Sequence, residues 1–290
     1  MSYLHIPNLY KDQTILKFKE CYAMEKIHGT SAHLKYSEEV GLTFFSGGEK
    51  HDRFVNLFDS LGLPEKLRGV VSDAPIIIYG EAYGGKQQGM SATYGAELKF
   101  IAFDVRIGEA WLEVPNAEDV CLKTAIEFVH YEKIPTDLAS IDAQRDADSV
   151  QAIRNGVGPG KIREGVVLRP LTELTKKNGA RIIAKHKRDE FMETSTPRKV
   201  NLAKLAIEAD ANKIALDWVT EQRLAHVLDK MPDANDIKDT KRILAAMVED
   251  VLREAEGEIE VNNTVRAKIN ARTAQLWRQH LYAKLAAGAD

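Results

Sequence analysis

The apolar pattern changes character about two thirds of the way along the chain. Up to about Lys187, short runs rich in Ile, Val, Phe and Tyr alternate with glycines, and after about Pro197 the pattern is almost wholly helical in period. We therefore expect an α+β domain with antiparallel sheets at residues 1–195 and a small all-α domain at residues 196–290. The boundary is expected near residues 194–199. A chain of 290 residues is long enough for two domains, each with its own core.

Local patterns predict individual elements within both parts. In the first part, the expected strands are residues 41–49, 74–82, 99–105, 165–169 and 180–185, and the expected helices are residues 50–61 and 120–129. In the second part, helices are expected at residues 202–228, 237–256 and 265–287.

Composition and charge exclude several classes of protein. Hydrophobic residues make up 44% of the chain and the formal net charge is −3, which excludes a disordered chain and a strongly basic coat for nucleic acid. Cys21 and Cys121 are too few for a disulfide framework or a four-cysteine zinc site. No apolar run approaches the length of a membrane span, and the N-terminal stretch lacks the signal-peptide pattern. We therefore expect a cytoplasmic protein without a membrane partner. We also expect a monomer, although nothing in the composition bears on the oligomeric state.

Five short motifs place reactive side chains at the ends of expected strands. In chain order they are EKIHGT (25–30), YGEAYG (79–84), FIAFD (100–104), REGVVL (163–168) and AKHK (184–187). Each has an ordinary structural explanation when taken alone, such as a rim carboxylate or a core aromatic. Lys185 and Lys187 lie two residues apart, so on a strand they project from the same face. The ordered set is much more specific than any one member.

This ordered set resembles the nucleotidyl motifs of covalent lysine nucleotidyltransferases, the superfamily of ATP-dependent ligases and mRNA capping enzymes. EKIHGT, with histidine before the glycine, is similar to the RNA ligase 2 family, whereas DNA ligases and capping enzymes usually have aspartate there. The resemblance covers residues 21–187, and the helical tail also resembles the arrangement in that family. It implies an adenylyltransferase domain followed by a helical domain that assists RNA-end binding.

The resemblance implies that Lys26 is the nucleophile, which attacks the α-phosphate of ATP and forms a lysyl-AMP. A primary amine attacks phosphorus only when it is unprotonated, and neighbouring cations favour that state. Lys185 and Lys187 would supply this positive field, grip the α-phosphate and stabilise its charge during transfer. His28 would assist the later steps, or else hydrogen-bond only to the backbone.

Further roles follow from the same resemblance. Phe103 would stack on adenine, while Glu25 and the backbone of Ile27 would read the adenine edge. Gly29 would allow a tight turn beside the ligand. Glu81 and Glu164 would contact the ribose or hold Mg²⁺.

The implied function is that of an ATP-dependent RNA ligase. It would use ATP and Mg²⁺ to join RNA ends that bear a 5′-phosphate and a 3′-hydroxyl, in a nicked or base-paired context, through lysyl-AMP and RNA-adenylate intermediates. A DNA ligase or capping-type enzyme is an alternative, opposed by the histidine in EKIHGT and by the lack of a C-terminal β-barrel pattern. A catalytically decayed RNA-binding protein is another, opposed by the retained reactive residues.

Two positions depart from the family pattern. Ser31 stands where the family usually has asparagine, and Ser46-Gly47-Gly48 stands where it commonly places an arginine that meets the 5′-phosphate. The candidates for replacing that arginine are an anion-binding nest of glycine amides and the side chains Lys50, His51 and Arg53.

Two basic stretches are candidates for contacting RNA phosphates outside the pocket. Residues 174–188 contain six cations and no carboxylate side chain, and residues 261–289 contain five cations and none. The plainer interpretation of each is a solvated face. The cations are Lys176, Lys177, Arg181, Lys185, Lys187 and Arg188 in the first, and Arg266, Lys268, Arg272, Arg278 and Lys284 in the second.

Overall fold

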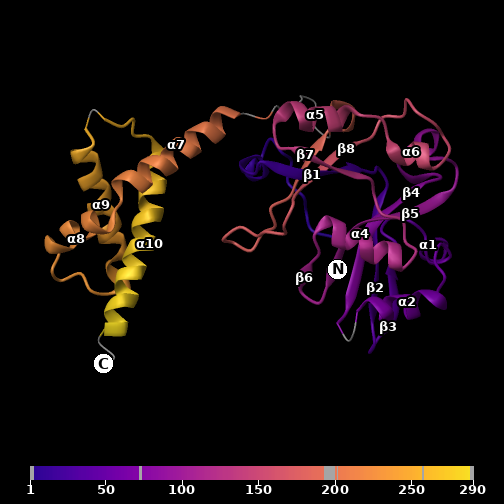
Figure 1. Cartoon of the computed structure of the whole chain (residues 1–290), viewed down its shortest axis with the longest axis horizontal. Helices are drawn as coiled ribbons and strands as arrows, with labels where there is room; N and C mark the ends of the chain where they lie inside the picture. The colour runs from indigo at the N-terminus through magenta and orange to yellow at the C-terminus, as the bar shows by residue number, and fades with distance from the viewer. Residues whose placement is uncertain (1–2, 72–73, 193–199, 201, 257, 288–290) are drawn as a thin grey trace. The chain divides into compact units, whose positions relative to one another are not determined.

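The computed structural model describes residues 3–71, 74–192, 200, 202–256 and 258–287. It divides into two compact units, Met1–Val200 and Asn201–Asp290 (Figure 1). The boundary expected at residues 194–199 lies outside the described residues. The first unit contains two antiparallel sheets, and the described part of the second unit is built from helices. The predicted α+β fold class is therefore confirmed.

The four-stranded sheet of the first unit brings three of the motifs together. Its strand order is β7-β1-β8-β9, formed by Tyr131–Pro135, Glu20–Lys26, Gly165–Pro170 and Ala184–Lys187. All neighbouring strands are antiparallel, and the register places Lys26 opposite Gly165 and Gly165 opposite Lys187. Residues from three distant parts of the sequence therefore form one row across the end of the sheet.

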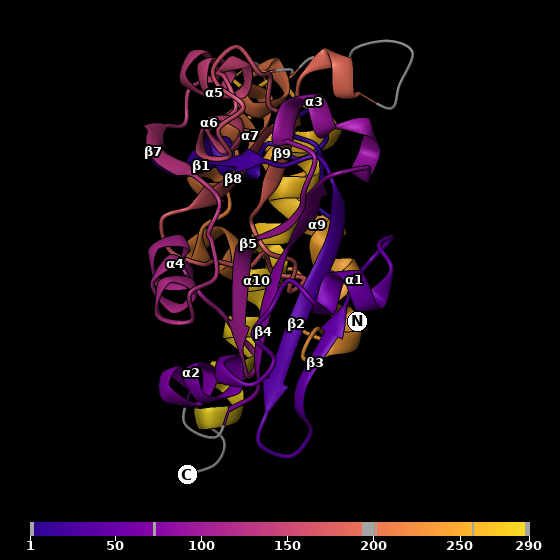
Figure 2. The ribbon, with the colours of Figure 1, turned by 90° about the vertical axis from the view of Figure 1, so that its right-hand side faces the viewer.

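The five-stranded sheet has the order β3-β2-β4-β5-β6, and strands β3, β2, β4 and β5 can be followed in Figure 2. Ser31 on β2 lies opposite Glu81 on β4, which lies opposite Ile101 on β5. The face of this sheet opposite to the side chains of Ser31 and Glu81 packs against helices. It contributes to the largest apolar cluster of the unit. The strands are β2 (Thr30–Ser37), β3 (Gly41–Phe45), β4 (Ile76–Gly84), β5 (Leu98–Ile107) and β6 (Ala110–Trp111), and the packed helices include α1 (His51–Val55), α2 (Gly62–Val70) and α4 (Val114–Lys123).

Short helices complete the first unit. Asp137 caps α5 and Ser149 caps α6, because each side chain accepts a hydrogen bond from a backbone N–H in the first turn. The remaining elements are α3 (Ser91–Tyr94), α5 (Leu138–Asp146), α6 (Val150–Arg154), η1 (Thr14–Lys17), η2 (Gln87–Gly89) and η3 (Asp189–Phe191).

The second unit packs its helices around the buried side chains of Trp277, Ile269, Met247 and Ile243. The predicted helix at residues 202–228 is two helices, because Thr220 is extended and its hydroxyl caps the second one. No described helix combines the length and the apolar character needed to cross a bilayer. The elements are α7 (Leu202–Trp218), α8 (Glu221–Asp229), η4 (Ile237–Asp239), α9 (Thr240–Glu254) and α10 (Asn263–Ala287).

Other boundaries in the first unit differ from the prediction because tertiary contacts decide them. The apolar spacing at residues 120–129 predicted a helix, but α4 ends at Lys123 and Ala125 takes a positive φ of 59°. The chain then runs beside β5, where Phe128 bridges Ala102. The expected strand at residues 180–185 begins only at Ala184, and α1 ends at Val55 rather than near residue 61.

A buried cluster of charges links the five-stranded sheet to the four-stranded one. Asp104 on β5 is fully buried and accepts hydrogen bonds from Arg169 at 2.9 Å, Arg181 at 2.6 Å and the Tyr3 hydroxyl at 2.7 Å. Glu173 pairs with both arginines. Residues 174–188 were expected to contact RNA phosphates through six cations. For Arg181 this expectation is wrong, because its guanidinium is buried and pairs with Asp104 and Glu173.

We predict that Asp104→Ala lowers the free energy of unfolding of the first unit by about 3–5 kcal/mol, because it leaves two buried guanidinium groups without their shared carboxylate. Urea denaturation, followed by circular dichroism, measures this loss. Asp119→Ala is the matched control, since Asp119 forms an exposed pair with Lys123 and its removal costs less than about 1 kcal/mol. Equal losses in the two variants would contradict a structural role for the buried cluster.

Candidate active site

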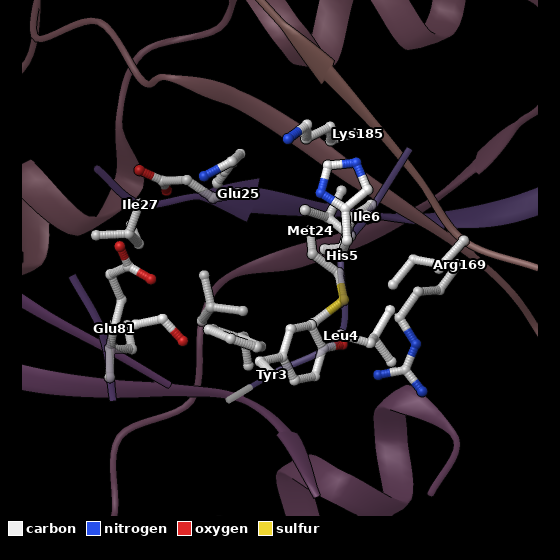
Figure 3. Close-up of a pocket in the computed structure, with 17 residues that line it drawn as sticks. Tyr3, Leu4, His5, Ile6, Met24, Glu25, Ile27, Glu81, Arg169 and Lys185 are labelled. Atoms are coloured by element: carbon white, nitrogen blue, oxygen red, sulfur yellow. The ribbon is translucent and has the colours of Figure 1, made fainter. Parts of the chain in front are cut away.

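A cavity of about 400 Å³ in the first unit is lined by both sheets and by residues 3–6 near the N-terminus. This volume lies within the range of ordinary small-molecule sites. Figure 3 shows Tyr3, His5, Glu81 and Lys185 disposed around one hollow. The lining includes Lys26, Ile27, Glu25, Phe103, Glu81 and Lys185 of the predicted site.

The carboxylate of Glu164 holds three basic side chains at one edge of this site. Its Oε2 lies 2.9 Å from Lys26 Nζ and 3.0 Å from His28 Nδ1, and its Oε1 lies 2.9 Å from Lys187 Nζ. Glu164 directly precedes Gly165, the residue that stands between Lys26 and Lys187 in the sheet register. The backbone pairing thus explains why these side chains meet.

Gly165 permits the close approach of β9. A Cβ at this position would lie 2.2 Å from the carbonyl oxygen of His186, and the φ of 151° is one that L side chains rarely adopt. A side chain at this position of the REGVVL motif would therefore clash with β9, which explains why the residue is glycine.

Opposing effects set the charge of Glu164. Burial alone would raise the pKa of this carboxyl, but the hydrogen bond from His28 and the positive charges of Lys26 and Lys187 lower it to about 2. Glu164 is therefore an anion throughout the physiological range, and it keeps the basic side chains together.

The pKa of Glu81 is shifted in the opposite direction to that of Glu164. Burial raises its pKa to about 7, and the negative charge of Glu164 adds to this effect, although Lys26 works against it. Its Oε1 accepts a hydrogen bond of 3.0 Å from the backbone N–H of Gly29. A Cβ on Gly29 would lie 2.3 Å from the carbonyl oxygen of Ala82, so the turn after His28 requires glycine.

The carboxylate of Glu25 is engaged by the first turn of α6. It accepts hydrogen bonds from the Ser149 hydroxyl at 2.5 Å and from the backbone N–H groups of Val150 at 3.0 Å and Gln151 at 3.3 Å. Consecutive residues of a strand point to opposite faces, so Glu25 and Lys26 project away from each other. This geometry leaves the backbone of Glu25, rather than its carboxylate, for contact with a base in the cavity.

The chain near the N-terminus forms a cavity wall that the motifs did not indicate. The backbone of Lys185 is bracketed by this segment, since Leu9 N–H donates to its carbonyl at 2.8 Å and its own N–H donates to Pro7 at 2.9 Å. The ring of Tyr3 lies 4.9 Å from that of Phe103 in an edge-on arrangement. Residues 3–9 carry no periodic pattern, and no sequence signal identified them.

The turn Ser46-Gly47-Gly48, which stands where an arginine was expected, packs closely against the start of β2. Gly48 N–H donates to the Thr30 hydroxyl at 2.8 Å, and a Cβ on Gly47 would lie 2.2 Å from the Ser31 carbonyl oxygen. Arg53 forms an ion pair with Glu49 at 3.4 Å. The glycine amide that makes this bond is therefore satisfied within the protein, which weakens the expectation of an anion-binding nest.

The described residues contain no group of three or more His, Cys, Asp or Glu side chains able to hold a metal ion. Both oxygens of Glu164 are occupied by basic groups, so a cation bound there would first displace Lys26 or Lys187. Glu164 in this arrangement does not fit a resident metal site. Glu81 as a metal ligand stays a prediction.

Comparisons with known proteins identify the family of the chain. The family model described as RNA ligase matches residues 19–187, more than half of the chain, so the chain belongs to the RNA ligase family. A search of curated proteins finds no match.

Among solved structures, the chain is similar to RNA ligase from Naegleria gruberi. The structure of that ligase with PPi aligns with a TM-score of 0.50 and 15% identity, covering 67% of this chain and 57% of that one. A variant with ATP and Mn aligns with a TM-score of 0.50 and 14% identity, covering 66% and 56%. The chain therefore spans little more than half of the length of these proteins, and the likeness at this identity establishes the fold.

We predict that Glu81→Gln stabilises the protein above about pH 7 and has little effect below about pH 4.5. The folded state holds the Glu81 proton more tightly than the unfolded state, so the wild type loses stability as the pH rises from about 4.5 to 7. The amide keeps an acceptor for the Gly29 N–H but carries no charge. The expected gain at pH 8 is about 3 kcal/mol at most, since each pKa unit corresponds to about 1.4 kcal/mol.

Thermal melting of the two proteins at pH 4, 6 and 8 measures this difference. A constant difference across the three pH values would contradict a partly buried, proton-binding Glu81.

Proposed function

We propose that the chain is an ATP-dependent RNA ligase that joins a 3′-hydroxyl and a 5′-phosphate through lysyl-AMP and RNA-adenylate intermediates. The observation that carries this proposal is the placement of Lys26 on the wall of a nucleotide-sized cavity. Its Nζ lies 2.9 Å from the carboxylate of Glu164, which also pairs with Lys187. Membership of the RNA ligase family supports RNA as the substrate.

In the first step, the Lys26 amine attacks the α-phosphorus of ATP. A phosphorus–nitrogen bond forms, the bond to the bridging oxygen breaks, and pyrophosphate leaves with that electron pair. Lys185 and Lys187 are the cations that would meet the charge on the α-phosphate. Before attack, Lys26 gives up a proton, and Glu81, with a pKa of about 7, is the neighbouring carboxylate suited to exchange it near neutral pH.

ATP and a divalent cation enter as one substrate in this proposal. The similar Naegleria ligase variant holds ATP and Mn, and the absence of a carboxylate cluster among the described residues favours an ion carried by the phosphates of the nucleotide. The adenine would stack on Phe103 and meet the backbone of Glu25 and Ile27, while Glu81 would lie near the ribose or the ion. Gly29 would keep the turn narrow enough for the ligand.

The later steps transfer AMP to the 5′-phosphate of RNA and then release it. Attack by the neighbouring 3′-hydroxyl closes the phosphodiester and expels AMP. His28, held 3.0 Å from Glu164, is the side chain next to Lys26 that would assist these steps. We propose a nicked or base-paired RNA as the substrate, and a monomer as the active form.

We predict that Lys26→Ala abolishes the ATP-dependent sealing of a nicked RNA duplex, with a loss of at least about a thousandfold in rate. The same variant should still seal RNA that already carries a 5′-adenylate, because the nucleophile acts only in loading AMP. Gel electrophoresis of labelled strands measures both reactions. Lys66→Ala, at an exposed position on α2, is the control and should retain full activity.

Retained sealing by Lys26→Ala with ATP would contradict the assignment. A wild type that joins nicked DNA but not nicked RNA would favour the DNA ligase alternative, and a wild type that binds RNA without taking AMP would favour a decayed enzyme.

The exposed cations near the C-terminal end of α10, Arg278 and Lys284, are proposed to contact RNA phosphates. We predict that the double variant Arg278→Glu, Lys284→Glu weakens RNA binding and lowers its logarithmic salt dependence by roughly one unit for each phosphate that the helix no longer neutralises. AMP loading should not change, since these residues lie in the other compact unit from Lys26.

The control is the double variant Lys213→Glu, Lys241→Glu, which makes the same change in net charge at exposed positions of α7 and α9, outside the groove lined by Arg278 and Lys284. Fluorescence anisotropy with labelled RNA at several salt concentrations compares the two. Equal weakening by both variants would contradict a specific role for α10.

A further inference from the structure

A row of aromatic rings leads from the cavity to the solvent along the cavity-facing side of the five-stranded sheet. From the inner end, the ring centroids of Phe103 and Tyr3 lie 4.9 Å apart, those of Tyr3 and Tyr79 5.1 Å, those of Tyr79 and His33 5.3 Å, and those of His33 and Phe45 5.0 Å. The last pair is stacked, with an interplanar angle of 22°. The row thus joins the candidate adenine site to the edge strand β3.

Phe45 is the exposed end of this row. Phe45 is 41% exposed, whereas its stacking partner His33 is only 8% exposed. The pair therefore presents the ring of Phe45 to solvent, with the buried ring of His33 beneath it. Burial lowers the pKa of His33, so the ring is neutral at physiological pH and suited to stacking. The outer face of the Phe45 ring is therefore accessible to a ligand, while its inner face rests on His33.

The position of the pair connects it to the cavity. Ser31 lines the cavity, and His33 follows it on the same face of β2, about 6.6 Å further along the strand. That distance is close to the spacing of successive nucleotides in an extended strand. A nucleic acid whose 5′-phosphate lies at the cavity mouth therefore places an adjoining nucleotide over His33 and Phe45.

The charges around the pair favour a polyanion. Lys35 is exposed on the same face of β2, two residues beyond His33, and Lys50 is exposed after the turn that follows Phe45. The neighbouring acid Glu49 is held by Arg53 at 3.4 Å and by Gln87 at 2.7 Å. Aromatic rings stack on the faces of nucleobases, and nearby cations hold the phosphate backbone. A break in a paired strand exposes the face of the terminal base, so such a pair also suits the proposed nicked substrate.

We propose that Phe45, supported by His33, is a stacking platform for an RNA nucleobase beside the 5′-phosphate at the strand break. This proposal rests on the proposed RNA ligase function and assigns a binding role to the segment that lacks the expected arginine. Contact with the base replaces part of the affinity that an arginine would supply through the phosphate.

The test separates stacking from general hydrophobic contact. The protein is first loaded with AMP from ATP, and single-turnover transfer of AMP to a 5′-phosphorylated RNA is then measured below saturation for the wild type and for Phe45→Ala, Phe45→Leu and Phe45→Trp. We expect Phe45→Ala and Phe45→Leu to slow the transfer by about tenfold and Phe45→Trp to retain it, because only a ring supplies the stacking energy. Val40→Ala, at an exposed apolar position between β2 and β3, is the control and should match the wild type.

An RNA with an abasic nucleotide next to its 5′-phosphate gives an independent readout. It should slow the wild type by the same factor as Phe45→Ala and slow that variant no further, since both changes remove the same stacking interaction. Loading of AMP from ATP should stay within about twofold of the wild type in every variant.

A Phe45→Leu variant that transfers AMP as fast as the wild type, or additive effects of the abasic RNA and Phe45→Ala, would overturn the platform. Failure of the wild type to load AMP would instead overturn the proposed function. In that case, anisotropy measurements with the same RNAs on the untreated protein still test the platform, and no difference between the wild type and Phe45→Ala would reject it.

Discussion

The carboxylate of Glu164 is the interaction on which the site depends. It is almost fully buried, and it gathers Lys26, His28 and Lys187 from segments that are up to about 160 residues apart in the sequence. Without a shared anion, basic groups this close would repel one another and move apart. In the proposed function, the phosphates of ATP compete with Glu164 for these cations. The carboxylate would then hold the cations in place until the nucleotide binds.

Two further buried carboxylates fix the frame around this group. Asp104 ties β5 to the four-stranded sheet through Arg169 and Arg181, which holds the adjacent Phe103 at the cavity. Glu25 ties the strand that carries Lys26 to the first turn of α6 on the opposite face. Lys26 therefore reaches into the cavity from a strand whose other side is anchored. Such preorganisation limits the reorganisation needed at the moment of reaction.

The sequence predicted the members of the site better than the contacts between them. Lys26, Glu164 and Lys187 were recognisable because their motifs occur in a fixed order, and the antiparallel register then brings them into one row. The roles assigned to them stay predictions. Composition could not show that Arg181 turns inward, because charge counts do not report which cation finds a buried partner. The helix expected at residues 120–129 failed for a related reason, since Phe128 gains more by packing beside β5 than by continuing a helix.

The measurement that tests the account most directly is peptide mapping of the protein after incubation with ATP and Mg²⁺. Tandem mass spectrometry locates any covalently bound AMP on a proteolytic fragment. We expect one AMP for each chain, attached to Lys26 through an acid-labile phosphorus–nitrogen bond. Attachment at another lysine, or no attachment on protein first freed of AMP with pyrophosphate, would contradict it.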